Sequence, residues 1–213
     1  YFCTPSLYLG GGEYQSAMSN AYRGLFFLDA PVGFVTDKML AEGRADGLKV
    51  VVLPACRWVE RESLDRLRAL AARGVRLVTL GDGPTFDEYR HPHPAGSLLP
   101  ADEVTSVRPG PPGDIRRQMA PILDRAQVRR PIRCFRADGE TPEAVECRSV
   151  VHGDGVLCSL LNLGKAPVRI RLEHHGETVR SWKDLISDRE SDSGWMELRP
   201  SDPRLLWIAA DRT

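Results

Sequence analysis

The sequence lacks several features that would point directly to a function. It has only five cysteines and no C-x-x-C pair, and no apolar run approaches the ~20 residues that cross a bilayer. Charge of one sign is also missing, because 29 basic residues balance 29 acidic ones. A neutral chain lacks the positive potential that binds nucleic acid or anionic membranes. We therefore expect neither nucleic acid nor a membrane among its partners.

The cysteines are unevenly spaced, at Cys3, Cys56, Cys134, Cys147 and Cys158. Their odd number argues against a disulfide framework, and their spacing argues against a zinc site. A tight turn in the predicted hairpin places Cys147 opposite Leu160 or Asn162, not opposite Cys158. We expect five buried thiols and no metal, which is compatible with a reducing compartment. This favours a cytoplasmic location, while a start without methionine leaves a secreted parent open.

A strand, a helix and a second strand follow one another between residues 49 and 81. Lys49–Pro54 is a short apolar, β-branched run that stops at a proline, and Val75–Leu80 is a second such run. Between them, Leu64 and Leu70 mark a leucine-rich face at helical spacing, and Gly74 ends the helix. Two buried strands joined by a helix predict a right-handed crossover in a parallel sheet.

The residues around this unit continue the alternation of strands and helices. The expected elements are, in order, the tail of a strand at Tyr1–Thr4, a helix over 13–28, a strand at Val32–Val35, a brief helix ending at Leu40, a loop over 89–112 and a helix over 114–125. Thr36 or Asp37 caps the brief helix, and Asp114 caps the last one. Pro121 should kink or shorten that last helix.

From about residue 131 the pattern changes to short strands with turn signals about every ten residues. The expected strands are Ile132–Phe135, Val145–Val151, Val156–Leu163, Val168–Leu172, Trp195–Leu198 and Leu205–Ala209. His152–Gly155 is a strong hairpin signal between the second and the third. We therefore place an α/β domain at residues 1–130, with the loop 89–112 and the helix 114–125 inside it, and a small antiparallel sandwich at residues 131–213.

Two residues lie where chemistry is usually found in parallel sheets, just after a strand. Cys56 follows the first strand, but no histidine or helix start lies close to it in the sequence, so a packed thiol is the better interpretation. Asp82 lies between two glycines after the second strand, and Pro84 follows it where a nucleophile elbow would begin a helix. A plain turn accounts for the same residues.

The histidines and tryptophans are further candidates for binding. His91 and His93, and the pair His174 and His175, lack the i, i+4 spacing and the nearby carboxylate of a metal site, so solvated histidines are expected. The tryptophans are Trp58, Trp182, Trp195 and Trp207. They are expected to pack in cores or interfaces rather than to stack on sugars.

Nine stretches occur in an order and at a spacing that match known proteins. They are Val32–Val35, Lys49–Pro54, Leu64–Ala72, Arg73–Val78, Gly81–Glu88, Val145–Arg148, Leu160–Leu163, Lys183–Ser187 and Leu198–Pro200. The first five resemble the glutamine-amidotransferase-like middle domain, or trimerisation domain, of family-42 β-galactosidases and related glycoside hydrolases. The last four resemble the C-terminal β-domain of the same proteins. The resemblance implies an α/β, flavodoxin-like parallel sheet of the class I glutamine-amidotransferase type with flanking helices, followed by the β-sandwich.

The resemblance also implies which residues are missing. In that family two catalytic glutamates lie on a (β/α)₈ barrel that precedes the amidotransferase-like domain. A barrel takes about 250 residues, and the chain has 213 in all. The amidotransferase nucleophile, a cysteine after the strand that matches Val75–Leu80, is replaced by Asp82, and Cys56 follows a different strand.

We therefore expect a non-catalytic accessory and oligomerisation fragment of a β-galactosidase-like glycoside hydrolase, without a cofactor. Its expected partners are the catalytic barrel of the same polypeptide, further copies in a homo-oligomer such as a trimer, and the carbohydrate substrate of the parent protein. One alternative is a stand-alone amidotransferase-like or hydrolase enzyme that uses Cys56 or Asp82. A second alternative is a carbohydrate-binding module with tryptophan platforms.

Overall fold

The computed structural model describes residues 1–94, 99 and 104–209 of the chain. These residues separate into two compact units. Unit 1 comprises Tyr1–Gly24 and Val32–Val128, and unit 2 comprises Leu25–Pro31 and the residues from Arg129 onward. The chain therefore passes between the units three times.

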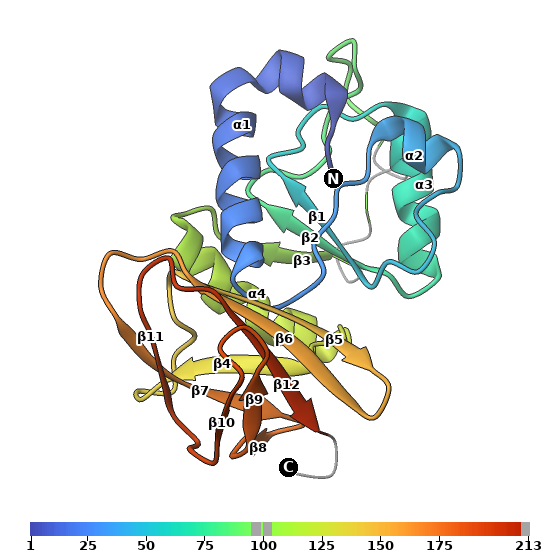
Figure 1. Ribbon diagram of the computed structural model, residues 1–213. Helices are drawn as coiled ribbons and strands as arrows, with labels where there is room; N and C mark the ends of the chain where they lie inside the picture. Colours follow the sequence, from blue (N-terminus) through green and yellow to red (C-terminus); the bar gives the residue numbers. More distant parts are fainter. Residues whose placement is uncertain (95–98, 100–103, 210–213) are drawn as a thin grey trace. The chain divides into compact units, whose positions relative to one another are not determined.

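Unit 1 contains a three-stranded parallel sheet in the order β1-β2-β3, flanked by helices (Figure 1). Its elements are α1 (Thr4–Phe26, whose last residues belong to unit 2), α2 (Asp37–Ala41), β1 (Val50–Pro54), α3 (Arg61–Ala72), β2 (Arg76–Leu80), β3 (Val104–Val107) and α4 (Pro112–Arg125). The predicted strand–helix–strand crossover is confirmed as β1, α3 and β2. Gly74 follows α3 with a φ of 87°, in the left-handed region that glycine enters without strain.

The core of unit 1 explains why this crossover forms. Val51 and Leu53 of β1, Leu77 of β2, and Leu64 and Leu67 of α3 are all buried. They belong to one hydrophobic cluster, so the leucine face of α3 and the alternate residues of the strands are removed from water together.

The start of the chain differs from the expected pattern. The helix α1 begins at Thr4, well before the expected start at residue 13, and Gly11 kinks it with φ 51° and ψ −127°. Val32–Val35 is not a strand; only Thr36 pairs with Phe2, in an isolated parallel bridge. The Phe2 amide donates to the Val35 carbonyl oxygen over 2.8 Å. A single bridge therefore takes the place of the expected strand pairing.

The expected loop over 89–112 contains a strand, β3. Its four residues pair in parallel with Leu77–Leu80 of β2, and so short a run carries almost no periodic signal of its own. The following helix α4 begins at Pro112 with Pro111 at the cap position, and Asp114 lies in its first turn. It continues past Pro121 to Arg125, so the expected cap is wrong and the helix is not cut short there.

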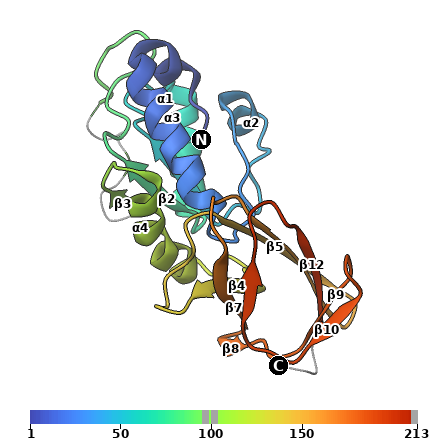
Figure 2. The ribbon, with the colours of Figure 1, turned by 60° about the vertical axis from the view of Figure 1, so that its left-hand side comes forward.

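Unit 2 is antiparallel and has two sheets. Its strands are β4 (Ile132–Arg136), β5 (Val145–His152), β6 (Gly155–Asn162), β7 (Val168–His174), β8 (Glu177–Thr178), β9 (Trp182–Asp184), β10 (Arg189–Ser191), β11 (Met196–Leu198) and β12 (Arg204–Ala209). One sheet has the order β10-β9-β12-β6-β5; the other has the order β11-β7-β4, with β8 paired to β7. Figure 2 shows β4 and β7 on one side of the unit and β9, β10 and β12 on the other.

Both sheets contribute to one hydrophobic cluster, which includes Ile132 and Ile170 from one sheet and Leu160 and Leu206 from the other. The expected hairpin forms, and Cys147 pairs with Leu160, as its turn predicts. The short strands β8, β9 and β10 were not expected from the sequence. All five cysteines are buried and free, which confirms the expected buried thiols.

Candidate functional site

The carboxyl end of β1 holds Cys56, the first candidate from the sequence. After Pro54 the chain turns through Ala55, whose φ of 46° lies in the left-handed region, and Cys56 is completely buried. The Cys56 thiol donates to the Pro54 carbonyl oxygen over 3.6 Å. Burial raises the pKa of the Cys56 thiol, and the neighbouring Cys3 acts in the same direction. The thiolate that nucleophilic attack requires is therefore disfavoured here.

The thiol of Cys3 interacts with the thiol of Cys56, although the two residues lie far apart in the sequence and no motif links them. The Cys3 amide donates to the Tyr14 hydroxyl over 2.7 Å, and its thiol donates to the Trp58 carbonyl oxygen over 3.1 Å. Hydrogen bonding with the Cys56 thiol lowers the pKa of Cys3, burial opposes this effect, and contacts with Ser6 add to the lowering. Cys3 and Cys56 are both fully buried, so a substrate reaches neither thiol unless unit 1 opens.

A polar network beside these thiols joins the first turns of three helices. The Asp37 carboxylate accepts hydrogen bonds from the Tyr1 hydroxyl, from the Ser63 hydroxyl at 3.1 Å and from the Thr4 amide at 2.9 Å. Burial raises the pKa of the hydroxyls of Tyr1 and Tyr14, so both remain neutral donors. Both carboxylate oxygens are engaged within the fold, and the network therefore serves to hold α1, α2 and α3 together.

The sequence marked Asp37 only as a possible helix cap. In the structure the Thr36 hydroxyl caps α2 by accepting from the Met39 amide over 3.2 Å, which leaves the Asp37 carboxylate for the network. The partners Tyr1 and Ser63 lie far from Asp37 in the sequence, and no local motif links them. Only the fold brings these residues together.

Asp82, the second candidate, lies on the turn that follows β2. Its side chain is exposed, and Gly81 before it has a φ of 82°. The loops after β1 and β2 pair with each other, because the amides of Thr85 and Phe86 both donate to the Arg57 carbonyl oxygen over 3.0 Å. Within residues 1–94, no hydrogen bond or ion pair connects Asp82 with Cys56, so the structure does not bring the two candidates into one site.

The histidines have separate surroundings. His91 is exposed and lies 3.3 Å from the Asp87 carboxylate, whereas the ring of the buried His93 contacts the Val59 carbonyl oxygen at 2.9 Å. In unit 2, burial lowers the pKa of His174, and the adjacent His175 adds to this effect. Among the residues that the structure describes, no group of three or more histidine, cysteine, aspartate or glutamate side chains is arranged to hold a metal ion.

The four tryptophans are all partly buried, and most have a polar neighbour at the ring. The Arg57 guanidinium lies 5.4 Å from the Trp58 ring centre and 5.3 Å from that of Phe86. The Arg169 guanidinium lies 5.3 Å from the Trp195 ring centre. A cation on a ring face competes with a sugar that would stack there.

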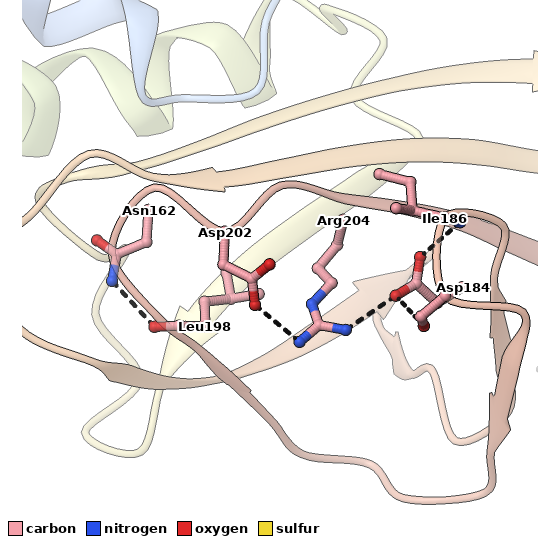
Figure 3. A network of polar contacts seen from close by, with 7 residues as sticks. Asn162, Asp184, Ile186, Leu198, Asp202 and Arg204 are labelled. Carbon is pink, nitrogen blue, oxygen red and sulfur yellow. Dashed lines mark hydrogen bonds and ion pairs between the residues drawn. The ribbon is translucent and has the colours of Figure 1, made fainter.

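Unit 2 contains a further polar network, centred on the buried Asp184 (Figure 3). Arg204 of β12 bonds Asp184 at 2.9 Å and Asp202 at 3.0 Å. The Ser187 hydroxyl and the Ile186 amide also donate to the Asp184 carboxylate, at 2.7 Å and 3.1 Å. Burial alone would raise the pKa of Asp184, but these hydrogen bonds hold it below its usual value. The network fixes the β9–β10 turn to β12, so its role is to stabilise the fold of unit 2.

No helix in the described part of the chain has the length and apolar character needed to cross a membrane.

No protein-family model matches the chain, and no curated protein matches it in sequence. Solved structures do match it. The apo exo-carrageenase GH42 from Bacteroides ovatus aligns with a TM-score of 0.72 and 14% identity, over 91% of this chain and 26% of the enzyme.

Two β-galactosidases give the same result. That of Rahnella sp. R3 aligns with a TM-score of 0.68 and 11% identity, over 94% of this chain and 38% of its own. That of Bacillus circulans sp. alkalophilus aligns with a TM-score of 0.64 and 13% identity, over 92% of this chain and 38% of its own. The described chain therefore has the fold of a part of GH42 glycoside hydrolases, and it spans between a quarter and two fifths of their length.

Proposed function

We propose that this chain is a non-catalytic accessory and assembly portion of a GH42-like glycoside hydrolase. In this proposal unit 1 is a flavodoxin-like, glutamine-amidotransferase-like domain and unit 2 is the small C-terminal β-domain. The chain packs against a catalytic barrel in the same polypeptide, associates with further copies and helps to wall the site where the parent protein binds its carbohydrate.

The observation that carries the proposal is the asymmetry of the structural matches. They cover at least 91% of this chain but at most 38% of the three enzymes. The shared fold therefore corresponds to one portion of a larger hydrolase. A (β/α)₈ barrel takes about 250 residues, more than the 213 of this chain.

The pairing of backbone segments supports the flavodoxin-like assignment of unit 1. The Tyr1 amino group donates to the Val52 carbonyl oxygen of β1 over 2.7 Å, while Phe2 bridges to Thr36 on its other side. Segment Tyr1–Cys3 thus lies between Val35–Thr36 and β1. Continued through β2 and β3, this arrangement corresponds to the strand order 2-1-3-4-5 of flavodoxin-like sheets.

The surroundings of the two candidate residues favour a role without chemistry. Catalysis by a cysteine requires an accessible thiolate and a base that activates it. Cys56 is buried and its pKa is raised. Asp82 is an exposed carboxylate on a turn, and such a position lacks the desolvated pocket that usually tunes a catalytic acid or base.

Large exposed side chains on unit 1 support the assembly role. Tyr8 is 79% exposed, Tyr89 72% and Phe34 52%. Phe34 stacks on Tyr22 with ring centres 5.5 Å apart, so its position is fixed in advance of any association. Aromatic residues are enriched in the cores of protein interfaces, because they bury much area for little loss of side-chain entropy.

Two measurements on the full chain test the proposal. Incubation with aryl-glycosides should release no aglycone, and robust turnover would overturn the non-catalytic role. Sedimentation equilibrium should give a mass that is a multiple of the 23.7 kDa of one chain, with three copies expected. The double variant Phe34→Ser, Tyr89→Ser should shift the chain towards the monomer, whereas Val150→Ser, an equally exposed change in unit 2, should not. A monomer at all concentrations would contradict the assembly role.

A further inference from the structure

Segment Leu25–Pro31 connects two parts of unit 1 but packs as part of unit 2. Its middle residues Leu28, Asp29 and Ala30 are 3%, 8% and 3% exposed. Two arginines hold its backbone. Arg148 of β5 donates to the Ala30 carbonyl oxygen over 2.9 Å, and Arg130, just before β4, donates to the Leu28 carbonyl oxygen over 3.5 Å. The segment is therefore docked by hydrogen bonds that depend on its exact backbone path.

Asp29 is the charged residue at the centre of this segment. Its φ of 53° places it in the left-handed region, which aspartate tolerates better than most residues. The Ser149 hydroxyl donates to its carboxyl group over a long 3.4 Å. The Arg148 guanidinium lies nearby, but its charge is shared among other partners. It forms an ion pair with the Glu146 carboxylate at 3.2 Å, donates to the Ala30 carbonyl oxygen and lies over the ring of Phe26.

The groups around Asp29 do not offset its burial completely. Burial raises the pKa of Asp29 to about 7, against the opposing effects of the Cys147 thiol, Arg148, Ser149 and Arg130. The Cys134 thiol of β4 also faces it. A carboxyl group in this position binds its proton more tightly than it would in water, so the docked segment favours the neutral form of Asp29.

We propose that Leu25–Pro31 is a pH-dependent tether, which docks on unit 2 while Asp29 is neutral and opens more often once Asp29 is ionised. The pKa of Asp29 is about 7 in the docked state, against an ordinary value of 3.8 once the segment is in water. Docking is therefore strongest below about pH 4. It weakens as the pH rises towards 7, and it levels off above that value because both states are then ionised.

Hydrogen exchange of the full chain tests the tether. The measurement follows the amides of Leu25–Ala30 by mass spectrometry at pH 5 and at pH 7.5, with each rate divided by its intrinsic exchange rate. Opening that releases one proton grows by up to about tenfold per pH unit in this window. We expect the protection of the segment to be at least about tenfold lower at pH 7.5 than at pH 5.

Two variants and an internal reference make the result specific. Asp29→Asn keeps the shape and the left-handed backbone of the protonated side chain but cannot ionise, so its protection should not change with pH. Asp154→Asn, a matched change at an exposed position, should keep the pH dependence of the natural chain. The strands β6 and β12 should keep their protection at both pH values. Equal loss in those strands, a flat profile in the natural chain, or the same profile in Asp29→Asn would each overturn the proposal.

Discussion

Asn162, at the end of β6, connects three segments of unit 2 through one buried side chain. Its amide nitrogen donates to the carbonyl oxygens of Ala166 at 2.9 Å and Leu198 at 3.0 Å, and its amide oxygen accepts from the Gly164 amide at 2.8 Å. The side chain is only 2% exposed, so each of these groups would otherwise be buried without a partner. The bond to Leu198 is visible in Figure 3.

Asn162→Asp should therefore destabilise unit 2. The change removes two donated hydrogen bonds and places a carboxylate against two carbonyl oxygens, which should lower the free energy of unfolding by about 2–4 kcal/mol at pH 7. Urea denaturation monitored by tryptophan fluorescence measures the effect. Gln127→Glu makes the same chemical change at an exposed position and should stay within about 0.5 kcal/mol. Equal stability of the two variants would contradict the role of Asn162.

The sequence predicts the burial of individual side chains better than it predicts their hydrogen-bonding and packing partners. Five buried thiols could be expected because cysteine behaves as a small apolar residue. The contact between Cys3 and Cys56 could not, since it depends on where the chain start packs against β1. The sequence does not predict the contact between Cys147 and Cys158 either, whose sulfur atoms lie 3.7 Å apart. They are not opposite each other in the ladder, but both point from neighbouring strands into the same core.

Among the elements, α1 contains a backbone position that only glycine suits. Gly11 has φ 51° and ψ −127°, a combination that side chains with a Cβ atom avoid. Gly11→Ala should therefore lower the free energy of unfolding by about 1–3 kcal/mol. Gly12→Ala has open space around its Cβ position and should raise stability by about 0.5–1 kcal/mol through its helix propensity. Thermal unfolding of both variants checks the opposite signs, and a shift of the same sign in both would contradict the kink.

The β9–β10 turn depends on the ion pair between Arg204 and the buried Asp184. Arg204→Met keeps the aliphatic stem but leaves the carboxylate without its cation, which should cost about 2–4 kcal/mol at pH 7. Because the pKa of Asp184 is held below its usual value, this stabilisation is present above pH 4 and is lost as the pH falls through the folded-state value. Urea denaturation of the natural chain and the variant at pH 7 and pH 3 should show the difference shrinking.

Lys183→Met provides the matched control on the same turn. Lys183 contacts Asp188 at 2.7 Å, but the two side chains are 39% and 83% exposed. Exposed pairs of this kind contribute little to stability, because water screens the attraction between the two charges. A loss in Lys183→Met as large as that in Arg204→Met would show that the surface pair, not the buried one, holds the turn.

The elements that could be predicted are those with a repeated pattern. The leucine face of α3 and the alternation in β7 identify these two elements in the sequence because several residues share one face. The turn residues between β5 and β6 identify those two strands as a hairpin. β3, with four residues, and β8–β10, with two or three each, are too short for a period to appear. These short strands form because a neighbouring strand presents backbone hydrogen-bonding groups to them. That neighbour is set by the fold and not by the local sequence. Val32–Val35 is the opposite case, because its apolar sequence is typical of a strand but these residues do not form one.

At the scale of the whole molecule, sequence order and structural grouping differ at Leu25–Pro31. A boundary near residue 130 follows from the change of pattern along the chain, but a segment a hundred residues earlier packs with the residues after that boundary. Such a segment has no compositional mark, since Leu-Phe-Phe-Leu continues the apolar face of α1 in the sequence. It belongs to unit 2 because the arginines at 130 and 148 hold its carbonyl groups.

This arrangement predicts that Leu28 stabilises unit 2 although its neighbours in sequence belong to unit 1. Leu28 is 3% exposed, and Leu28→Ala should lower the unfolding free energy of unit 2 by about 2–4 kcal/mol, since it leaves a cavity among buried groups. In a Trp58→Phe background the remaining tryptophans all report on unit 2, so fluorescence in urea follows that unit alone. Leu40→Ala, a matched change in the core of unit 1, should leave this signal in place. If Leu28→Ala leaves the unit 2 signal as unchanged as Leu40→Ala does, the segment does not belong energetically to unit 2.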